Sequence, residues 1–158
     1  LLRNIRLMRF LSKLWMPSRR EVFIIGGGLV GLELAEFLVE RNRKVIVLEP
    51  GPSFGAELSI VRRARVLHLL GEDGAELHKS VGDLEIGAHM IRFSLDGEVQ
   101  ERKCTQVIIA MGAEPDDSLL KELAGSSARI HQIGDCREVG YIDGAILDAR
   151  KLVQQMEL

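Results

Sequence analysis

Apolar and polar positions in the first third of the chain predict a βαβ unit. Two short, almost continuous apolar runs, 21–26 and 44–50, have the length and β-branched content of buried strands. The segment between them, 29–42, carries apolar residues at helical spacing. A strand, a helix and a second strand in this order favour two parallel strands joined by a crossover helix.

The pattern continues beyond this unit and predicts an α/β fold, a Rossmann-like domain with a parallel sheet. A turn-rich stretch leads into an expected helix over 57–74, which is ended by Gly71 or Gly74. Over 81–103 the apolar runs become short and alternating, and Asp96-Gly97 is a typical hairpin turn, so this part favours a small antiparallel meander. The remaining expected elements are strands over 75–80, 105–112 and 129–136 and a closing helix over 143–158.

The opening residues, 1–15, combine basic and apolar positions at helical spacing. Basic residues at 3, 6, 9 and 13 lie opposite apolar residues at 5, 8, 11 and 15, which predicts a basic amphipathic helix. We favour a packing helix that leads into Pro17, with a transit peptide or a membrane-surface helix as the alternatives. The chain starts at Leu1 rather than at a methionine, which suggests an excised or truncated piece.

Composition says more about the partners that the chain could bind than about its fold. The 158 residues carry a formal net charge of -2 and are 46% hydrophobic, which suits one well-buried core, or one domain plus part of a second, and gives no reason to expect nucleic acid or a membrane as partner. No apolar run approaches the roughly 20 residues of a membrane span. Cys104 and Cys136 form neither a CxxC pair nor a metal-ligand spacing, and the four histidines are scattered. We therefore expect a reducing, cytoplasmic location and no metal site.

Gly26, Gly28 and Gly31 form a G-x-G-x-x-G motif directly between the first predicted strand and the first predicted helix. In this context the first glycine permits a tight turn, and the second lets a pyrophosphate approach the backbone. The third allows the helix to pack closely on the strand. Phosphates would lie at the positive end of the helix, where N–H groups point at them. The motif therefore predicts dinucleotide binding.

Glu49 ends the second predicted strand, where an acid that accepts hydrogen bonds from the adenosine ribose is expected. A carboxylate at this position repels a 2′-phosphate, and the residues that follow it supply no arginine to neutralise one. NAD is therefore favoured over NADP. Arg62 and Arg63 follow on the next predicted helix and keep NADP open, although a solvated helix face explains them equally well.

Three motifs together resemble a known group of flavoproteins. They are G-G-G-L-V-G-L-E at 26–33, A-M-G-A-E-P at 110–115 and I-G-D-C at 133–136. In this order they resemble the two-dinucleotide-binding-domain flavoprotein reductases. The likeness runs from about Arg19 to the end of the chain and is greatest to the C-terminal region of the NADH:flavin oxidoreductase family, the 2,4-dienoyl-CoA reductase and enoate reductase group. The segments it implies are 1–19 as a basic helix or linker, 20–112 as the NAD(P)-binding domain and 113–158 as the C-terminal segment of an FAD-binding domain.

The resemblance also implies roles for individual residues. Glu49 would hold the adenosine ribose. Glu33 would lie near the nicotinamide as the catalytic candidate, whereas its spacing with Glu36 and Glu40 indicates by itself only a solvated helix face. Asp135 would accept hydrogen bonds from the ribityl chain of FAD; without the resemblance it would be an Asp cap on a turn. The other implied cofactor contacts are Gly26, Gly27, Gly28, Leu29, Val30, Gly31, Ala110, Met111, Gly112 and Gly134.

Several parts of such an enzyme are missing from the sequence. The chain has one complete G-x-G-x-x-G where NAD(H) and FAD would each need one, and it lacks the FMN barrel and the clustered cysteines of an iron–sulfur centre. Methionine at 111 also replaces the threonine of the family's A-T-G turn, which removes a hydroxyl contact.

We therefore expect the NADH-binding part of a flavin-dependent oxidoreductase that passes hydride to FAD for reduction of an activated alkene and is inactive alone. The FMN barrel and the rest of the FAD domain would lie in the same or a partner chain. Two alternatives remain. One is a stand-alone, non-catalytic NAD(H)-binding module, and the other is a subunit that completes its FAD site with a partner chain.

Overall fold

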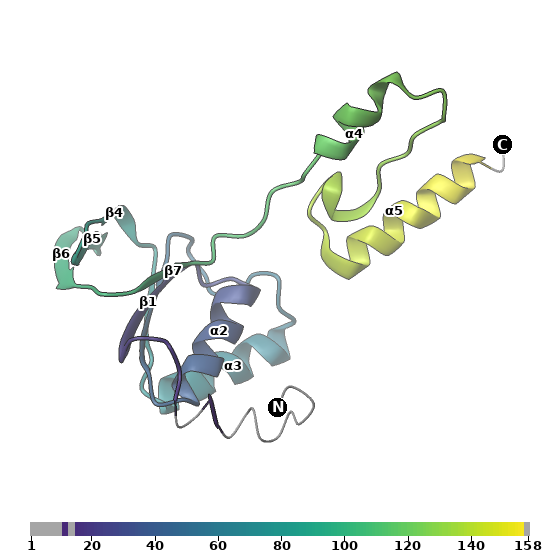
Figure 1. Ribbon diagram of the computed structural model, residues 1–158. Coiled ribbons are helices and arrows are strands. Elements are labelled where there is room, and N and C mark those ends of the chain that lie inside the picture. The colour runs from purple at the N-terminus through teal and green to yellow at the C-terminus, as the bar shows by residue number, and fades with distance from the viewer. Residues whose placement is uncertain (1–10, 13–14, 157–158) are drawn as a thin grey trace. The chain divides into compact units, whose positions relative to one another are not determined.

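The computed structural model describes residues 11–12 and 15–156, and the chain divides into two compact units, Leu1–Gly112 and Ala113–Leu158 (Figure 1). Each unit is described by itself below. The amphipathic helix expected over 1–15 falls largely outside the described residues. Within the described part, no helix is both long and apolar enough to cross a membrane.

The first unit is built on a four-stranded parallel sheet with the strand order β3-β2-β1-β7. Its two central strands, β1 (Glu21–Ile25) and β2 (Lys44–Glu49), are buried over almost their whole length and pair with Val22 opposite Val45. The outer strands are β3 (Glu76–Lys79) and β7 (Val107–Ile109). Continuous apolar runs suit strands that are covered on both faces. The predicted βαβ unit is therefore confirmed.

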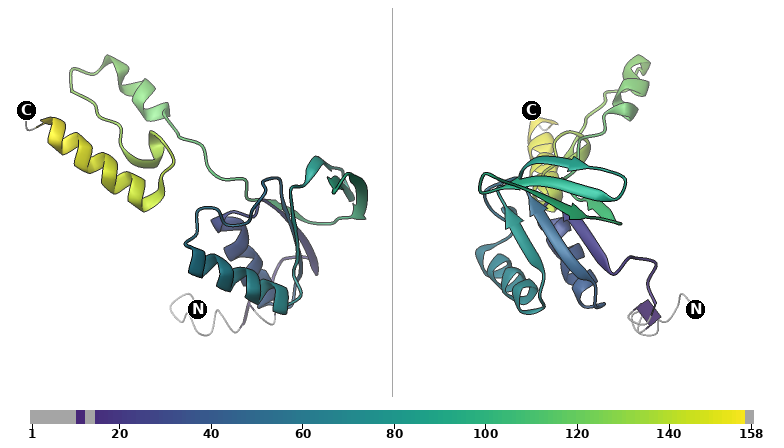
Figure 2. Two further views of the ribbon diagram at one scale, coloured as in Figure 1. Left: turned by 180° about the vertical axis from the view of Figure 1, so that it is seen from behind. Right: turned by 90° about the vertical axis from the view of Figure 1, so that its left-hand side faces the viewer.

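Helices α2 (Leu29–Val39) and α3 (Ile60–Glu72) cover one face of this sheet (Figure 2). The side chains buried between the helices and the sheet include Val22, Ile24, Leu32, Ala35, Leu38, Val45, Val47, Val66 and Leu70. On α2 the buried positions recur at three- and four-residue intervals, which is the periodicity that the sequence showed.

Both helices are shorter than expected, because turns replace their predicted ends. Asn42 adopts a left-handed conformation with φ of 55°, and the N–H of Arg43 donates to the carbonyl of Leu38 at 3.1 Å. This arrangement is a typical helix-terminating turn, so α2 ends three residues early. At the start of α3, residues 55–58 form a separate hydrogen-bonded turn, which delays the helix by three residues.

A three-stranded antiparallel sheet covers the opposite face of the parallel sheet (Figure 2). Its strands, in the order β4-β5-β6, are β4 (Gly82–Ile86), β5 (Met90–Leu95) and β6 (Glu98–Lys103). Ile91 and Phe93 of β5 pack against Phe23 and Ile46 of the parallel sheet in a second buried cluster. The β5–β6 turn has positive φ at Asp96 and Gly97, so the expected hairpin and meander are confirmed.

The described residues of the second unit, 113–156, form two helices and two short 3₁₀ turns. These are α4 (Ser118–Glu122), η1 (Leu123–Gly125), η2 (Gly134–Cys136) and α5 (Tyr141–Met156). The closing helix is confirmed as α5, but the strand expected over 129–136 is wrong. Among the described residues of this unit, 113–156, none forms a strand that could pair with it. An extended segment without a neighbour has no ladder for its backbone hydrogen bonds.

Candidate nucleotide-binding site

The glycine turn lies at the carboxyl end of β1, immediately before α2. The first helical hydrogen bond of α2 runs from the N–H of Leu32 to the carbonyl of Gly28 at 3.0 Å, and Gly28 is an N-cap without a side-chain cap. Helix geometry leaves the first N–H groups of α2 without intrahelical acceptors. These groups and the helix dipole make the end of α2 attractive to an anion such as a phosphate.

Two glycines of the turn are required by close main-chain packing. A Cβ at Gly31 would lie 1.9 Å from the carbonyl oxygen of Gly26, and a Cβ at Gly26 would lie 2.2 Å from the carbonyl oxygen of Ala110. Gly26 also has φ of 104°, in the left-handed region that favours glycine. The helix and the two neighbouring strand ends can therefore approach only because side chains are missing at these positions.

Gly28 differs from the other two glycines of the motif. The three atoms nearest to a Cβ there all belong to the side chain of Glu57, with Oε1 at 2.5 Å, rather than to the main chain of a neighbouring element. Packing of the fold therefore does not require glycine at this position. The absence of a side chain instead leaves the backbone at the start of α2 accessible, which is the geometry that a diphosphate needs.

Ala110, Met111 and Gly112 follow β7 and lie beside the glycine turn. The N–H of Ala110 donates to the carbonyl of Ile25 at 2.7 Å, next to Gly26. Gly112 has φ of 96°, in the left-handed region that favours glycine, and Met111 is 58% exposed. The structure therefore brings the 110–112 motif to the same edge of the sheet as the glycine motif, although the two are far apart in sequence.

The carboxylate of Glu49 lies at the end of β2 and contacts the glycine turn directly. Its Oε2 accepts a hydrogen bond from the N–H of Gly27 at 2.5 Å, and its Oε1 accepts one from the N–H of Gly51 at 2.5 Å. An ionised carboxylate has about four acceptor directions, so capacity remains for hydroxyl donors such as those of a ribose. These bonds hold the carboxylate beside the glycine turn. This is the position at which the sequence predicted an acid that accepts hydrogen bonds from the adenosine ribose.

Glu33 lies in the second turn of α2 and is paired with Arg62 of α3. The Nη2 of Arg62 lies 2.6 Å from Oε1 of Glu33, and both side chains are about half exposed. Sequence reasoning treated these two residues separately, because only the packing of α3 beside α2 brings them together. An exposed pair of this kind contributes little to stability, so Glu33 can exchange its partner at low cost.

Glu57 is a residue that sequence reasoning missed. Its Oε1 accepts a hydrogen bond from the N–H of Leu29, the first residue of α2, at 3.2 Å. No local signal marks it, because a glutamate in a polar loop is ordinarily solvated. Its position at the helix end depends on how the loop after β2 folds back onto the glycine turn.

The predicted Gly134-Asp135 motif lies in the second unit, in η2. Gly134 has φ of 71°, and its N–H donates to Oδ2 of the buried Asp148 at 3.1 Å. The carboxylate of Asp135 accepts hydrogen bonds through Oδ1 from the N–H groups of Gly140 at 3.0 Å and Tyr141 at 2.9 Å, at the start of α5. Asp135 therefore caps a helix, and its second oxygen retains acceptor capacity for a ligand hydroxyl.

Asp148 of α5 and Arg137, which directly follows η2, hold this turn in place. The guanidinium of Arg137 donates to both carboxylate oxygens of Asp148, with Nε at 3.0 Å and Nη2 at 2.5 Å. Desolvation raises the pKa of the Asp148 carboxyl, but the hydrogen bonds from Gly134 and Arg137 outweigh it and leave that pKa below its ordinary value. The turn is thus anchored by an ionised carboxylate.

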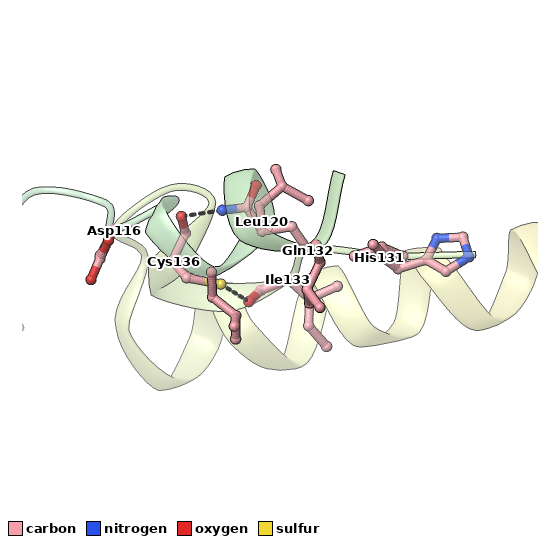
Figure 3. Close-up of a pocket in the computed structure, with 9 residues that line it drawn as sticks. Asp116, Leu120, His131, Gln132, Ile133 and Cys136 are labelled. Atoms are coloured by element: carbon pink, nitrogen blue, oxygen red, sulfur yellow. Dashed lines mark hydrogen bonds between the residues drawn. The ribbon is translucent and has the colours of Figure 1, made fainter. Parts of the chain in front are cut away.

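A cavity of about 270 Å³ also lies within the second unit, and Figure 3 shows its lining. Its walls are mostly apolar side chains of α4, η1 and the segment before η2. Gln132 donates through Nε2 to the carbonyl of Cys136 at 2.6 Å, and the thiol of Cys136 donates to the carbonyl of Ile133 at 3.1 Å. None of the site residues predicted from the sequence lines this cavity.

Comparison with protein families matches residues 1–139 to the family described as pyridine nucleotide-disulphide oxidoreductase. The chain belongs to this family. Pyridine nucleotide-disulphide oxidoreductases and the matched reductases use NAD(H) and FAD, so the cofactors expected from the sequence are confirmed for the family. The α/β fold with a parallel and a small antiparallel sheet agrees with this membership.

Individual relatives of the chain are larger oxidoreductases. It is 27% identical to an NADH oxidase of Thermoanaerobacter brockii over 92% of the chain and 23% of the relative. It is 32% identical to a bilirubin reductase of Mediterraneibacter gnavus over 78% of the chain and 19% of the relative. A solved 2-naphthoyl-CoA reductase complex superposes with a TM-score of 0.77 at 25% identity, over 90% of the chain and 22% of that protein. The chain thus spans about a fifth of the length of these relatives.

Proposed function

We propose that this chain is the NAD(H)-binding part of a flavin-dependent oxidoreductase that passes hydride from NADH to FAD. The observation that carries the proposal is the glycine turn at the end of β1, where Gly28 leaves the start of α2 open and Glu49 lies hydrogen-bonded at its side. When bound, the two cofactors supply the transfer of a hydride from nicotinamide to flavin. The chain contributes binding and alignment.

Each site residue has a distinct part in this proposal. The N–H groups at the start of α2, from Leu29 to Gly31, bind the diphosphate, and Glu49 accepts hydrogen bonds from the adenosine ribose. Glu33 lies one helical turn further along α2 and exchanges its contact with Arg62 for the nicotinamide. The 110–112 motif borders the nucleotide from the end of the neighbouring strand, β7. The carboxylate of Glu49 disfavours a 2′-phosphate, so NADH is the preferred nucleotide.

The second unit would supply the last segment of the FAD domain. Asp135 would accept a hydrogen bond from the ribityl chain, on a turn that Asp148 holds in place. The sequence has no second complete G-x-G-x-x-G for the ADP half of FAD, so the rest of the FAD domain would belong to the same or a partner chain. The FMN barrel would lie there as well. Cys104 and Cys136 are both free, which supports a cytoplasmic location.

Reduction of an activated alkene, such as a dienoyl-CoA or enoate, is the proposed final reaction. The likeness to a 2-naphthoyl-CoA reductase supports it, because that protein's name describes reduction of a CoA thioester, although its acyl group is aromatic. Other relatives are named for different acceptors, among them bilirubin. The residues of this chain serve the first half-reaction, which is the transfer of hydride from NADH to FAD. The alkene would be reduced by a part of the enzyme that lies outside this chain.

A stand-alone NAD(H)-binding module is the second candidate. It is supported by the location of the complete glycine motif, Glu49 and Glu33 within one unit, Leu1–Gly112. The purified chain is titrated with NADH, and the absorbance of any bound flavin is recorded. A yellow chain that bleaches on addition of NADH supports the flavoenzyme segment over the module, whereas a colourless chain that binds NADH agrees with both candidates, because the segment lacks most of its FAD domain. A chain that binds no NADH contradicts both.

A further inference from the structure

The loop after β2 returns to the glycine turn and is fixed there by main-chain and apolar contacts. The N–H of Gly55 donates to the carbonyl of Gly27 at 2.7 Å, and Phe54 is 9% exposed, with its ring against Gly27 and the core. Because of these contacts, the next charged residue, Glu57, lies at the start of α2. Its place there is therefore set by the fold of the loop.

The carboxylate of Glu57 fills the space that Gly28 keeps open. Its Oε1 accepts the hydrogen bond from the N–H of Leu29 at 3.2 Å and lies 2.5 Å from the point where a Cβ on Gly28 would be. This is the same N–H group and the same space that the proposed function gives to a phosphate of the dinucleotide. Two anions cannot share them, because both seek one donor and repel each other at this separation.

We infer that Glu57 is an internal competitor for the diphosphate position, so that NADH binds by displacing its carboxylate from the start of α2. The inference rests on the proposed function of the glycine turn. Glu57 is exposed and its side chain is flexible, so displacement needs only a rotamer change, while Phe54 and Gly55 keep the loop in place. The affinity of the chain for NADH is therefore lower than it would be without the Glu57 carboxylate at the glycine turn.

The substitution Glu57→Gln isolates the charge, since glutamine keeps the acceptor oxygen and the length of the side chain. Loss of the negative charge removes the repulsion of the diphosphate, and we expect NADH to bind about three- to tenfold more tightly at low salt. The gain shrinks as salt is added, because the charges are exposed and screened. Without nucleotide the same variant loses a favourable charge at the helix N-terminus, and its unfolding midpoint falls by about 1–3 °C.

The test compares the full 158-residue chain, Glu57→Gln and the control Glu72→Gln. Glu72 is an exposed glutamate at the other end of α3, so its substitution makes the same change in net charge away from the glycine turn. NADH fluorescence titrations at low and high salt, together with thermal unfolding by circular dichroism, give both readouts. Tighter, salt-dependent binding by Glu57→Gln alone, with a lower midpoint, is the expected result.

Other outcomes separate the two proposals. If the unsubstituted chain binds NADH and Glu57→Gln binds it equally or more weakly, Glu57 is not a competitor and the inference is overturned while the proposed function stands. An equal gain in Glu72→Gln shows a general charge effect and also overturns it. If neither the unsubstituted chain nor Glu57→Gln binds NADH, the proposed function fails and the inference fails with it.

Discussion

The substitutions Gly28→Ala and Gly31→Ala add the same methyl group to one motif, yet the structure predicts opposite consequences. At Gly31 the new Cβ lies 1.9 Å from the carbonyl oxygen of Gly26, so a main-chain segment between β1 and α2 must move. At Gly28 the three atoms nearest to the new Cβ belong to the carboxyl group of Glu57, and the backbone has φ of -73°, which any residue can adopt.

The magnitudes follow from what each methyl group meets. Forcing a methyl into a packed region costs about 1–3 kcal/mol, and we expect Gly31→Ala to lose about 3 kcal/mol of unfolding free energy because backbone, rather than a side chain, must yield. For Gly28→Ala we expect a loss of about 1 kcal/mol or less, since a flexible side chain gives way and alanine is a weaker N-cap than glycine. The methyl group instead obstructs the diphosphate, which weakens NADH binding by at least about 30-fold, or about 2 kcal/mol.

Urea unfolding followed by far-ultraviolet circular dichroism measures the free energy of unfolding, and NADH fluorescence titration measures the affinity for NADH. Titrations are made at a temperature where both variants are folded, so that weak binding by Gly28→Ala is not a result of unfolding. The reasoning is refuted if Gly28→Ala binds NADH as tightly as the unsubstituted chain. It is refuted equally if Gly28→Ala destabilises the fold as much as Gly31→Ala does.

Three further predictions concern charged groups. NADH should bind at least about tenfold more tightly than NADPH because the Glu49 carboxylate repels a 2′-phosphate; parallel titrations test this, and equal or reversed affinities count against the assignment. The Arg102 hydrogen bond lowers the pKa of Glu76 from 4.5 to about 2, so the folded-state pKa lies below the unfolded value. This pair stabilises the fold above about pH 4.5 by about 1–2 kcal/mol after solvent screening, and loses that contribution as the pH falls towards 2. In Glu76→Gln, the free energy of unfolding measured with urea should therefore change less between pH 5 and pH 2 than in the unsubstituted chain. An unchanged pH dependence would exclude the Glu76–Arg102 pair as its cause. Asp148→Asn should lower the thermal midpoint of the chain and speed hydrogen exchange at the N–H of Gly134, whereas unchanged exchange would show that Asp148 does not hold the turn.

The parts of the fold that the sequence predicted correctly depend on local signals. The runs that became β1 and β2 are apolar at almost every position, because both faces of these strands are covered. Asp96-Gly97 determines a hairpin turn through the left-handed conformations that these residues tolerate. The glycine motif was recognisable because its three glycines have a fixed local spacing between a predicted strand and a predicted helix.

Boundaries and unpaired segments were predicted less well. The segment 129–133 has the composition of a strand, yet a strand exists only where a neighbour supplies its hydrogen bonds, and the described residues of the second unit contain none. The end of α2 was placed too late, because its polar residues would also suit a helix. The left-handed turn at Asn42 that ends it has only a weak sequence signal.

The sequence by itself determined the βαβ unit, the glycine turn and the acid at the end of β2, because these depend on periodicity and on residues close together in the chain. Only the tertiary structure decided which charges meet at that turn. Arg62 pairs with Glu33 because α3 packs beside α2, and Glu57 reaches the start of α2 because its loop is anchored to Gly27. Such contacts join residues almost 30 positions apart, and no local pattern encodes the distance between them.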